Sequence, residues 1–221
     1  MKKIGIFIAG RLESQRLPNK LILPLRKTNL WEMACIRLAH LKDKYNVYAL
    51  CNDKQLIKIA KKYKLNIIER APETCLVDGP FNFIYKDVLN VEDDYLMFLN
   101  PCLYNLGVET IEKALKYFNK SPYESMTSVK EYNNWLYQQM GEKYWLKTIV
   151  NKENWSTKEI KGYYEAAHCF HIFNKDLLKS KNEMLGIHHD CFVVPKKETL
   201  DVDTPEDFEY AKYFLEGKND N

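Results

Sequence analysis

The chain has 221 residues, of which 46% are hydrophobic and 29% charged, and its formal net charge is +3. This composition is ordinary for one soluble domain with a buried core, and the near balance of charge gives no reason to expect a nucleic acid or a membrane as a partner. The six cysteines are scattered without a Cys-x-x-Cys pair, which argues against a zinc finger and predicts reduced core or near-core thiols in a cytoplasmic protein.

Short apolar runs predict strands along the whole chain. The first run, Ile4–Ala9, is followed at once by Arg11, so it fits a buried strand better than a signal peptide or a membrane span. Tyr95–Leu99 is the strongest candidate for a central strand. The remaining candidates are Asn46–Leu50, Asn66–Ile68, Met126–Val129, Ala167–Phe173 and Cys191–Val194.

Helical periodicity separates these runs. Apolar stripes with helical spacing predict three helices, at residues 30–41, 56–63 and 111–118. A last helix is expected to begin at Thr204, which is a suitable N-cap, with Pro205 in the first position and Asp207 at capping-box spacing.

The order of these elements indicates an α/β fold with a mostly parallel sheet and helices on its faces. We expect a single domain over residues 1–217 and a disordered tail at 218–221. Residues 131–163 are rich in Tyr, Trp, Asn and Lys and have no clean period, so they predict an insertion or arm.

The segment after the first strand carries the first chemical signal. In open α/β sheets ligands bind beyond the carboxyl ends of the strands, and here that position holds Arg11, Arg16 and Lys20. Spaced cations in a loop suit a polyphosphate, although a solvated basic turn would look the same. The sequence has neither a P-loop nor a G-x-G-x-x-G pattern.

A pair of aspartates near the carboxyl terminus carries the second signal. Asp201 and Asp203 are two residues apart in a predicted extended segment, so their side chains should project to one side. Two carboxylates on one face can hold Mg²⁺ together with substrate phosphates, whereas the alternative reading is a pair of turn or capping acids.

Taken together, three segments resemble the family of cytidylyltransferases that activate 3-deoxy-manno-octulosonate and sialic-type sugars, including relatives of spore-coat polysaccharide synthesis. The segments are GIFIAGRLESQRLPNKLILPL, YALCNDKQLIKIAKKYKLNIIERAP and LDVDTPEDF, and they occur in the order that the family shows. The resemblance implies a three-layer α/β/α, Rossmann-like nucleotidyltransferase fold. It also implies a homodimer formed through an inserted arm.

The resemblance assigns roles to individual residues. Arg11, Lys20, Asp201 and Asp203 would be the catalytic set, in which the two aspartates hold Mg²⁺. The nucleotide-binding set would comprise Ala9, Gly10, Arg11, Arg16, Lys20, Asn52, Asp53, Arg70 and Asn100. The acceptor's oxygen would attack the α-phosphorus of CTP and pyrophosphate would leave, with no covalent nucleophile on the protein.

The acceptor half departs most from the family pattern. None of the five arginines lies after Arg70, so no planar fork for a sugar carboxylate is expected there. The candidate acceptor-binding residues are Tyr104, Lys130, Tyr164, His168 and His171. Because His168 and His171 are three residues apart in a predicted strand, their side chains should face opposite ways.

The sequence therefore predicts an enzyme that transfers CMP from CTP to an acidic sugar for surface-glycan synthesis. A small phosphate or phosphonate acceptor is the alternative within the same class, since lysine and histidine would suffice to bind it. A catalytically inactive nucleotide-binding homologue is a further alternative, because Leu12 and Glu13 replace the family's glycine pair in the first loop. The last alternative is a nucleotide-free, glycosyltransferase-like domain.

Overall fold

The computed structural model describes residues 2–75, 80–146 and 162–217. A seven-stranded sheet forms its centre, with the strand order β3-β2-β1-β4-β8-β5-β9. The strands are β1 (Ile4–Ala9), β2 (Asn46–Cys51), β3 (Asn66–Glu69), β4 (Tyr95–Leu99), β5 (Ser125–Glu131), β8 (Tyr164–Asn174) and β9 (Asp190–Val193). Only β8 runs against its neighbours in the sheet, so the predicted mostly parallel sheet is confirmed.

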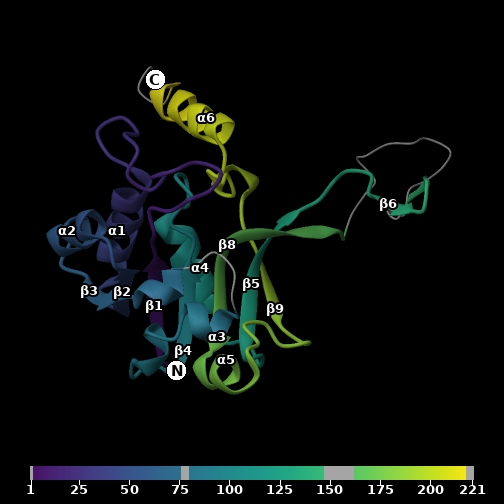
Figure 1. Ribbon diagram of the computed structural model, residues 1–221. Coiled ribbons are helices and arrows are strands. Elements are labelled where there is room, and N and C mark those ends of the chain that lie inside the picture. Colours follow the sequence, from purple (N-terminus) through teal and green to yellow (C-terminus); the bar gives the residue numbers. More distant parts are fainter. Residues whose placement is uncertain (1, 76–79, 147–161, 218–221) are drawn as a thin grey trace.

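Helices cover both faces of this sheet (Figure 1). On one face α1 (Leu30–Leu41), α2 (Lys54–Lys62) and α4 (Val108–Phe118) bury their apolar stripes against the strands. On the other face, α3 (Phe81–Ile84) and α5 (Lys175–Lys181) belong to a second layer, where Tyr85, Leu89 and Leu178 pack against the strand residues Phe7 and Phe173. The three-layer α/β/α architecture is thus confirmed, because each face of a parallel sheet needs a covering layer.

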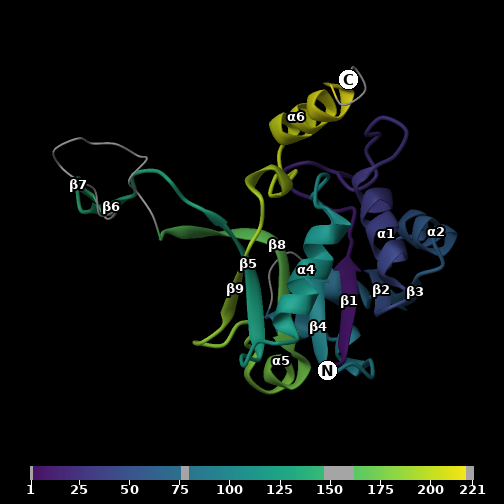
Figure 2. The same cartoon turned by 180° about the vertical axis from the view of Figure 1, so that it is seen from behind.

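The helix α6 (Pro205–Glu216) begins as its sequence predicts. Thr204 accepts a hydrogen bond from the backbone N–H of Asp207, and the Asp207 carboxylate accepts one from the N–H of Thr204, which completes a capping box. Figures 1 and 2 show α6 beyond the carboxyl ends of the parallel strands. Phe208 and Ala211 anchor it to the core. The described residues also form 3-10 turns at Pro72–Cys75, Val88–Asn90 and Lys196–Glu198.

An arm extends from the body in both views (Figures 1 and 2). The paired ends of β5 and β8 lead into it, and a hairpin of β6 (Tyr137–Met140) and β7 (Lys143–Leu146) lies at its end. Several large apolar side chains of this hairpin are exposed, among them Met140 at 59% and Trp145 at 57%. The hairpin lies within the insertion expected at 131–163; residues 147–161 and the tail 218–221 fall outside the described residues.

An irregularity in β8 overturns one expectation. The pairing register between β5 and β8 jumps between Thr127 and Val129, and His168 has a φ of 51° at this point. Regular alternation is interrupted there, and the rings of His168 and His171 lie together with their centroids 5.9 Å apart. The prediction that these two side chains face opposite ways is therefore wrong.

Ser128 supports this bulge from the neighbouring strand. Its buried hydroxyl accepts hydrogen bonds from the backbone N–H groups of Cys169 (2.9 Å) and Phe170 (3.1 Å) and contacts the Phe170 carbonyl at 3.1 Å. One side chain thus satisfies backbone groups that the interrupted ladder leaves without partners.

All six cysteines are free thiols, and Cys191 is exposed, so the expectation of a core or near-core position is wrong for that one. Among the described residues no helix is both long and apolar enough to cross a membrane.

Candidate active site

A cavity of about 340 Å³ opens where β1 and β4 end. It is built from the end of β1, the loop that follows it and the turn after β4. Its lining residues are Ala9, Arg11, Ser14, Gln15, Arg16, Lys20, Leu21, Phe98, Asn100, Pro101 and Cys102. The basic loop predicted to bind polyphosphate therefore forms one wall of a cavity at the position where α/β sheets bind ligands.

Close packing at Gly10 fixes the start of this loop. A Cβ atom at Gly10 would lie 2.6 Å from the ring of Trp31, whose indole N–H donates to the Leu56 carbonyl at 3.0 Å. The loop then folds on itself, since the backbone N–H groups of Ser14 and Asn19 both donate to the Leu12 carbonyl. Glycine at this position lets the loop leave the sheet directly over the buried indole.

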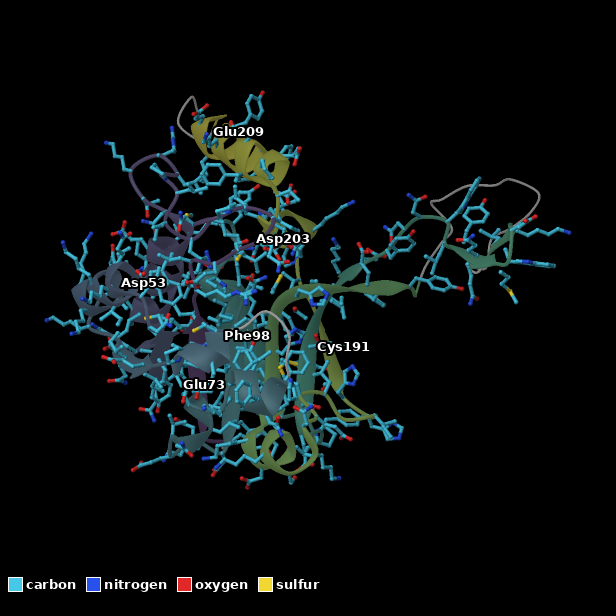
Figure 3. The ribbon with its side chains drawn as sticks, in the orientation of Figure 1. Asp53, Glu73, Phe98, Cys191, Asp203 and Glu209 are labelled. Atoms are coloured by element: carbon cyan, nitrogen blue, oxygen red, sulfur yellow. The ribbon has the colours of Figure 1, made fainter. Side chains whose placement is uncertain are left out.

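The basic loop and the aspartate pair meet at the edge of this cavity. Lys20 Nζ lies 2.7 Å from Asp203 Oδ1, across 183 residues of sequence, and donates to the Val202 carbonyl at 3.1 Å. Arg16 Nη2 lies 3.0 Å from Asp203 Oδ2. Burial alone would lower the pKa of Lys20, but the adjacent Cys102 thiol and the Asp203 carboxylate outweigh it, so this pKa is raised and the cation is secured. Figure 3 labels Asp203 in this region, between the sheet and α6.

Asp201 lies deeper than Asp203. It forms an isolated bridge with Leu103, and Asn100 Nδ2 donates to its Oδ2 at 2.9 Å. Among the described residues its Oδ1 is buried without a hydrogen-bond partner. Burial and then repulsion from Asp203 raise the pKa of Asp201. A buried carboxylate oxygen without a donor is a position that a cation would satisfy.

These two carboxylates fit Mg²⁺ only with help from a substrate. Within the described part of the chain, no group of three or more His, Cys, Asp or Glu side chains could hold a metal ion. Mg²⁺ commonly takes one or two protein carboxylates and completes its octahedron with phosphate oxygens and water, so the available donor set suits it.

Two of the residues predicted for the nucleoside pocket, Asp53 and Arg70, form hydrogen bonds within the protein. The Asp53 carboxylate caps α2 by accepting from the N–H of Gln55 at 2.7 Å, and Asn52 beside it is exposed. Asp53 appears toward α2, apart from Asp203, in Figure 3. The buried Arg70 guanidinium donates to the carbonyls of Thr74 and Ile84.

Arg11 and Arg70 both donate hydrogen bonds to backbone carbonyls of the segment that follows β3. Arg11 Nη1 donates to the Cys75 carbonyl at 3.0 Å. Burial raises the pKa of Tyr85 to about 12, and the positive charges of Arg70 and Arg11 oppose this increase. In this state both arginines are engaged with that segment, Arg11 from the cavity lining, and their role toward a nucleotide stays a prediction.

The predicted acceptor residues divide into two groups. His171 Nδ1 lies 2.9 Å from the Thr127 hydroxyl, and its backbone pairs with that of the cavity-lining Phe98, so the histidine face adjoins the cavity. Burial and then the neighbours His168 and His189 lower the pKa of His171 to about 4, so its ring is neutral at pH 7. Figure 3 shows Phe98 on this part of the sheet.

The other predicted acceptor residues lie elsewhere. Lys130 Nζ pairs with Glu165 Oε1 at 3.2 Å at the root of the arm, and Tyr164 beside it is 53% exposed. The ring of Tyr104 is buried against Phe214, with centroids 5.5 Å apart. The structure therefore brings the two histidines to the cavity side and leaves Tyr104 under α6.

Sequence reasoning did not select several residues that line or border the cavity, namely Ser14, Gln15, Phe98, Cys102 and Thr127. Ser14 and Gln15 stand between the predicted cations, so their position in the loop was a usable signal. Phe98 and Thr127 read as ordinary strand residues, and only the tertiary structure distinguishes them.

The three-layer architecture and the position of the cavity define the class of fold, which is that of nucleotidyltransferases. A CMP:2-keto-3-deoxy-manno-octonic acid synthetase complexed with CTP has the same fold at 15% identity and a TM-score of 0.71, with 98% of this chain and 100% of that chain covered. A 4-diphosphocytidyl-2C-methyl-D-erythritol synthase from Anaerococcus prevotii matches at 12% identity and a TM-score of 0.70, covering 97% and 99%.

A cytidylyltransferase from Leptospira borgpetersenii also matches, at 18% identity and a TM-score of 0.63, covering 98% of this chain and 88% of that one. No protein-family model matches the sequence. A search of curated proteins finds no similar sequence either. At these identities the likeness establishes the shared fold.

Proposed function

We propose that this protein is a CTP-dependent cytidylyltransferase. The observation that carries the proposal is the contact of Lys20 with Asp203 beside the cavity, because it joins the loop expected to bind polyphosphate to the aspartate pair expected to hold Mg²⁺. The three solved structures described above are named as a CMP-sugar-acid synthetase, a diphosphocytidyl-methylerythritol synthase and a cytidylyltransferase, and the first of them is complexed with CTP.

In this reaction Lys20 and Arg16 bind phosphate oxygens and disperse the negative charge that builds on the leaving pyrophosphate. Asp201 and Asp203 would hold Mg²⁺, which when bound polarises the α-phosphate and neutralises charge on the triphosphate. An acceptor oxygen attacks the α-phosphorus in line, the bond to the β-phosphate oxygen breaks, and pyrophosphate leaves. Positioning and electrostatics suffice, so no protein nucleophile is needed.

For the acceptor we propose an acidic sugar of the sialic or ulosonic type, used in surface-glycan synthesis in the cytoplasm. The resemblance of the sequence motifs supports this choice. A small phosphate or phosphonate is the second candidate, favoured by the lack of any arginine after Arg70 and by the histidine pair beside the cavity.

A pyrophosphate-release assay tests the proposal. Purified protein with Mg²⁺ would be given CTP, UTP, ATP or GTP together with a panel of acceptors: 3-deoxy-manno-octulosonate, N-acetylneuraminate, 2-C-methyl-D-erythritol 4-phosphate and simple phosphonates. We expect release with CTP and one acceptor, and loss of at least 99% of it in Asp201→Ala. CTP that fails to bind at all would contradict the function, while binding without turnover would favour the inactive homologue.

We also propose a homodimer formed through the arm. An isolated two-stranded hairpin is marginally stable in water, and this one exposes Tyr137, Met140 and Trp145. Sedimentation equilibrium tests this, with a dimer expected for the native chain and a monomer for the variant Met140→Ser/Trp145→Ser. A monomeric native chain would disprove it.

A further inference from the structure

A single carboxylate pairs with Arg16 and Lys20, two of the three cations that line the cavity. Asp203 offers Oδ1 to Lys20 at 2.7 Å and Oδ2 to Arg16 at 3.0 Å. The Lys20 ammonium group also donates to the Val202 carbonyl at 3.1 Å and neighbours the Cys102 thiol. An ammonium group has three donors, so the carboxyl-terminal segment and the turn after β4 occupy its hydrogen-bonding capacity in this state.

In this arrangement Asp203 and an incoming triphosphate compete for the same two cations. A triphosphate that needs Lys20 and Arg16 must take them from Asp203, and a displaced carboxylate would then stand beside the incoming phosphates. The Lys20 side chain is only 15% exposed and that of Asp203 30%, so water screens this repulsion poorly. Metal-free nucleotide therefore meets a site in which Arg16 and Lys20 are already paired with a carboxylate that offsets one of their two charges.

We propose that Asp203 makes the site select metal-bound CTP over metal-free CTP. This inference rests on the proposed function and deepens it. When Asp203 ligates a divalent cation, its charge is neutralised, and Lys20 and Arg16 become available to phosphate oxygens. The same residue thus suppresses binding of the unproductive nucleotide and supports binding of the productive one, which is specificity by an unfavourable contact as well as a favourable one.

Asp201 makes the exchange possible without large movement. Its orphan Oδ1 is buried, and Asn100 fixes its other oxygen at 2.9 Å, so a second carboxylate oxygen is already in place.

The test is isothermal titration of CTP into three proteins, each with EDTA and with excess Mg²⁺. The native chain is compared with Asp203→Asn, which keeps shape but removes the charge. The matched control is Glu206→Gln, which removes one negative charge from an exposed position three residues away on α6.

We expect Asp203→Asn to bind metal-free CTP about tenfold more tightly than the native chain. The increase in CTP affinity on adding Mg²⁺ should be smaller in this variant than in the native chain. Glu206→Gln should change the metal-free affinity less than twofold. In the native chain, linkage requires that CTP strengthen Mg²⁺ binding by the same factor by which Mg²⁺ strengthens CTP binding. This measurement needs no variant.

Metal-free affinity in Asp203→Asn that is equal to or weaker than native affinity would overturn the inference while leaving the proposed function standing. The same holds if Glu206→Gln tightens binding equally. If the native chain binds CTP under neither condition, the proposed function itself fails. If the melting curve shows that Asp203→Asn is unfolded, Asp203→Ser takes its place in the same titrations.

Discussion

Asn100 Nδ2 donates to Asp201 Oδ2 at 2.9 Å and so ties the end of β4 to the segment before α6. The Asn100 side chain also accepts from the N–H of Cys102 at 2.9 Å. One amide thereby shapes the turn at the cavity floor and orients a carboxylate whose other oxygen has no donor among the described residues.

Replacing Asp201 with Asn should stabilise the metal-free protein. Burial and repulsion from Asp203 raise the pKa of Asp201, so its ionised form is unfavourable at pH 7 and its removal should raise Tm by about 2–5 °C. Differential scanning calorimetry in EDTA measures this. The same variant should lose any stabilisation that Mg²⁺ gives the native chain, and a lower Tm in EDTA would contradict the account.

Removing the Lys20 charge should weaken nucleotide binding. A charge-assisted hydrogen bond contributes about 1.5–3 kcal/mol, so Lys20→Met should raise the Kd for Mg·CTP by roughly 10- to 100-fold. Titration calorimetry at fixed ionic strength gives the value. Lys62→Met is the control, because Lys62 pairs with Glu32 on the surface at 2.7 Å, and its loss should leave Kd unchanged. An unchanged Kd in Lys20→Met would remove the basic loop from the site.

Ser128→Ala should loosen the bulge that places His168. Its hydroxyl serves the backbone of Cys169 and Phe170, and leaving buried N–H groups unpaired costs on the order of 1–3 kcal/mol. Urea unfolding should show a lower midpoint with an unchanged m-value. Ser128→Thr, which keeps the hydroxyl, should lose less. Equal losses in the two variants would point to packing rather than hydrogen bonding.

His171 should make the protein sensitive to mild acid. Its pKa is lowered to about 4 in the folded chain, against an ordinary value of 6.5, so between these values the unfolded chain binds more protons. The free energy of unfolding that the neutral His171 ring contributes is therefore complete above about pH 6.5 and declines as the pH falls toward 4. At about 1.4 kcal/mol per pH unit, the total loss is on the order of 3 kcal/mol. Urea midpoints from pH 4 to 7 should fall less steeply in His171→Gln. A parallel pH dependence in both proteins would contradict this origin.

A side chain at Gly10 should disturb the loop at its first residue. The added Cβ would lie 2.6 Å from Trp31, and overpacking of this kind costs typically about 1–3 kcal/mol. Gly10→Ala should lower the urea midpoint and reduce CTP affinity together, since the loop carrying Arg11 and Lys20 shifts. Gly217→Ala, with open space around the position, is the control and should behave like the native chain.

The sequence by itself determined most of the local structure. Apolar runs such as Tyr95–Leu99 are buried strands because a strand covered on both faces needs apolar residues at every position. Thr204 and Asp207 specify the start of α6 through a contact within four residues, so no distant partner was required. The spacing of Asp201 and Asp203 around the buried Val202 likewise predicts both carboxylates on one side.

Only the tertiary structure determined which residues distant in the sequence contact one another. Lys20 and Asp203 are 183 positions apart, and only the packing of the loop after β1 beside the segment before α6 joins them. The bulge that brings His168 beside His171 depends on Ser128 in the neighbouring strand, and no local pattern encodes that pairing. Local propensity acts over a few residues, whereas register and contact between distant segments arise from how the whole core closes.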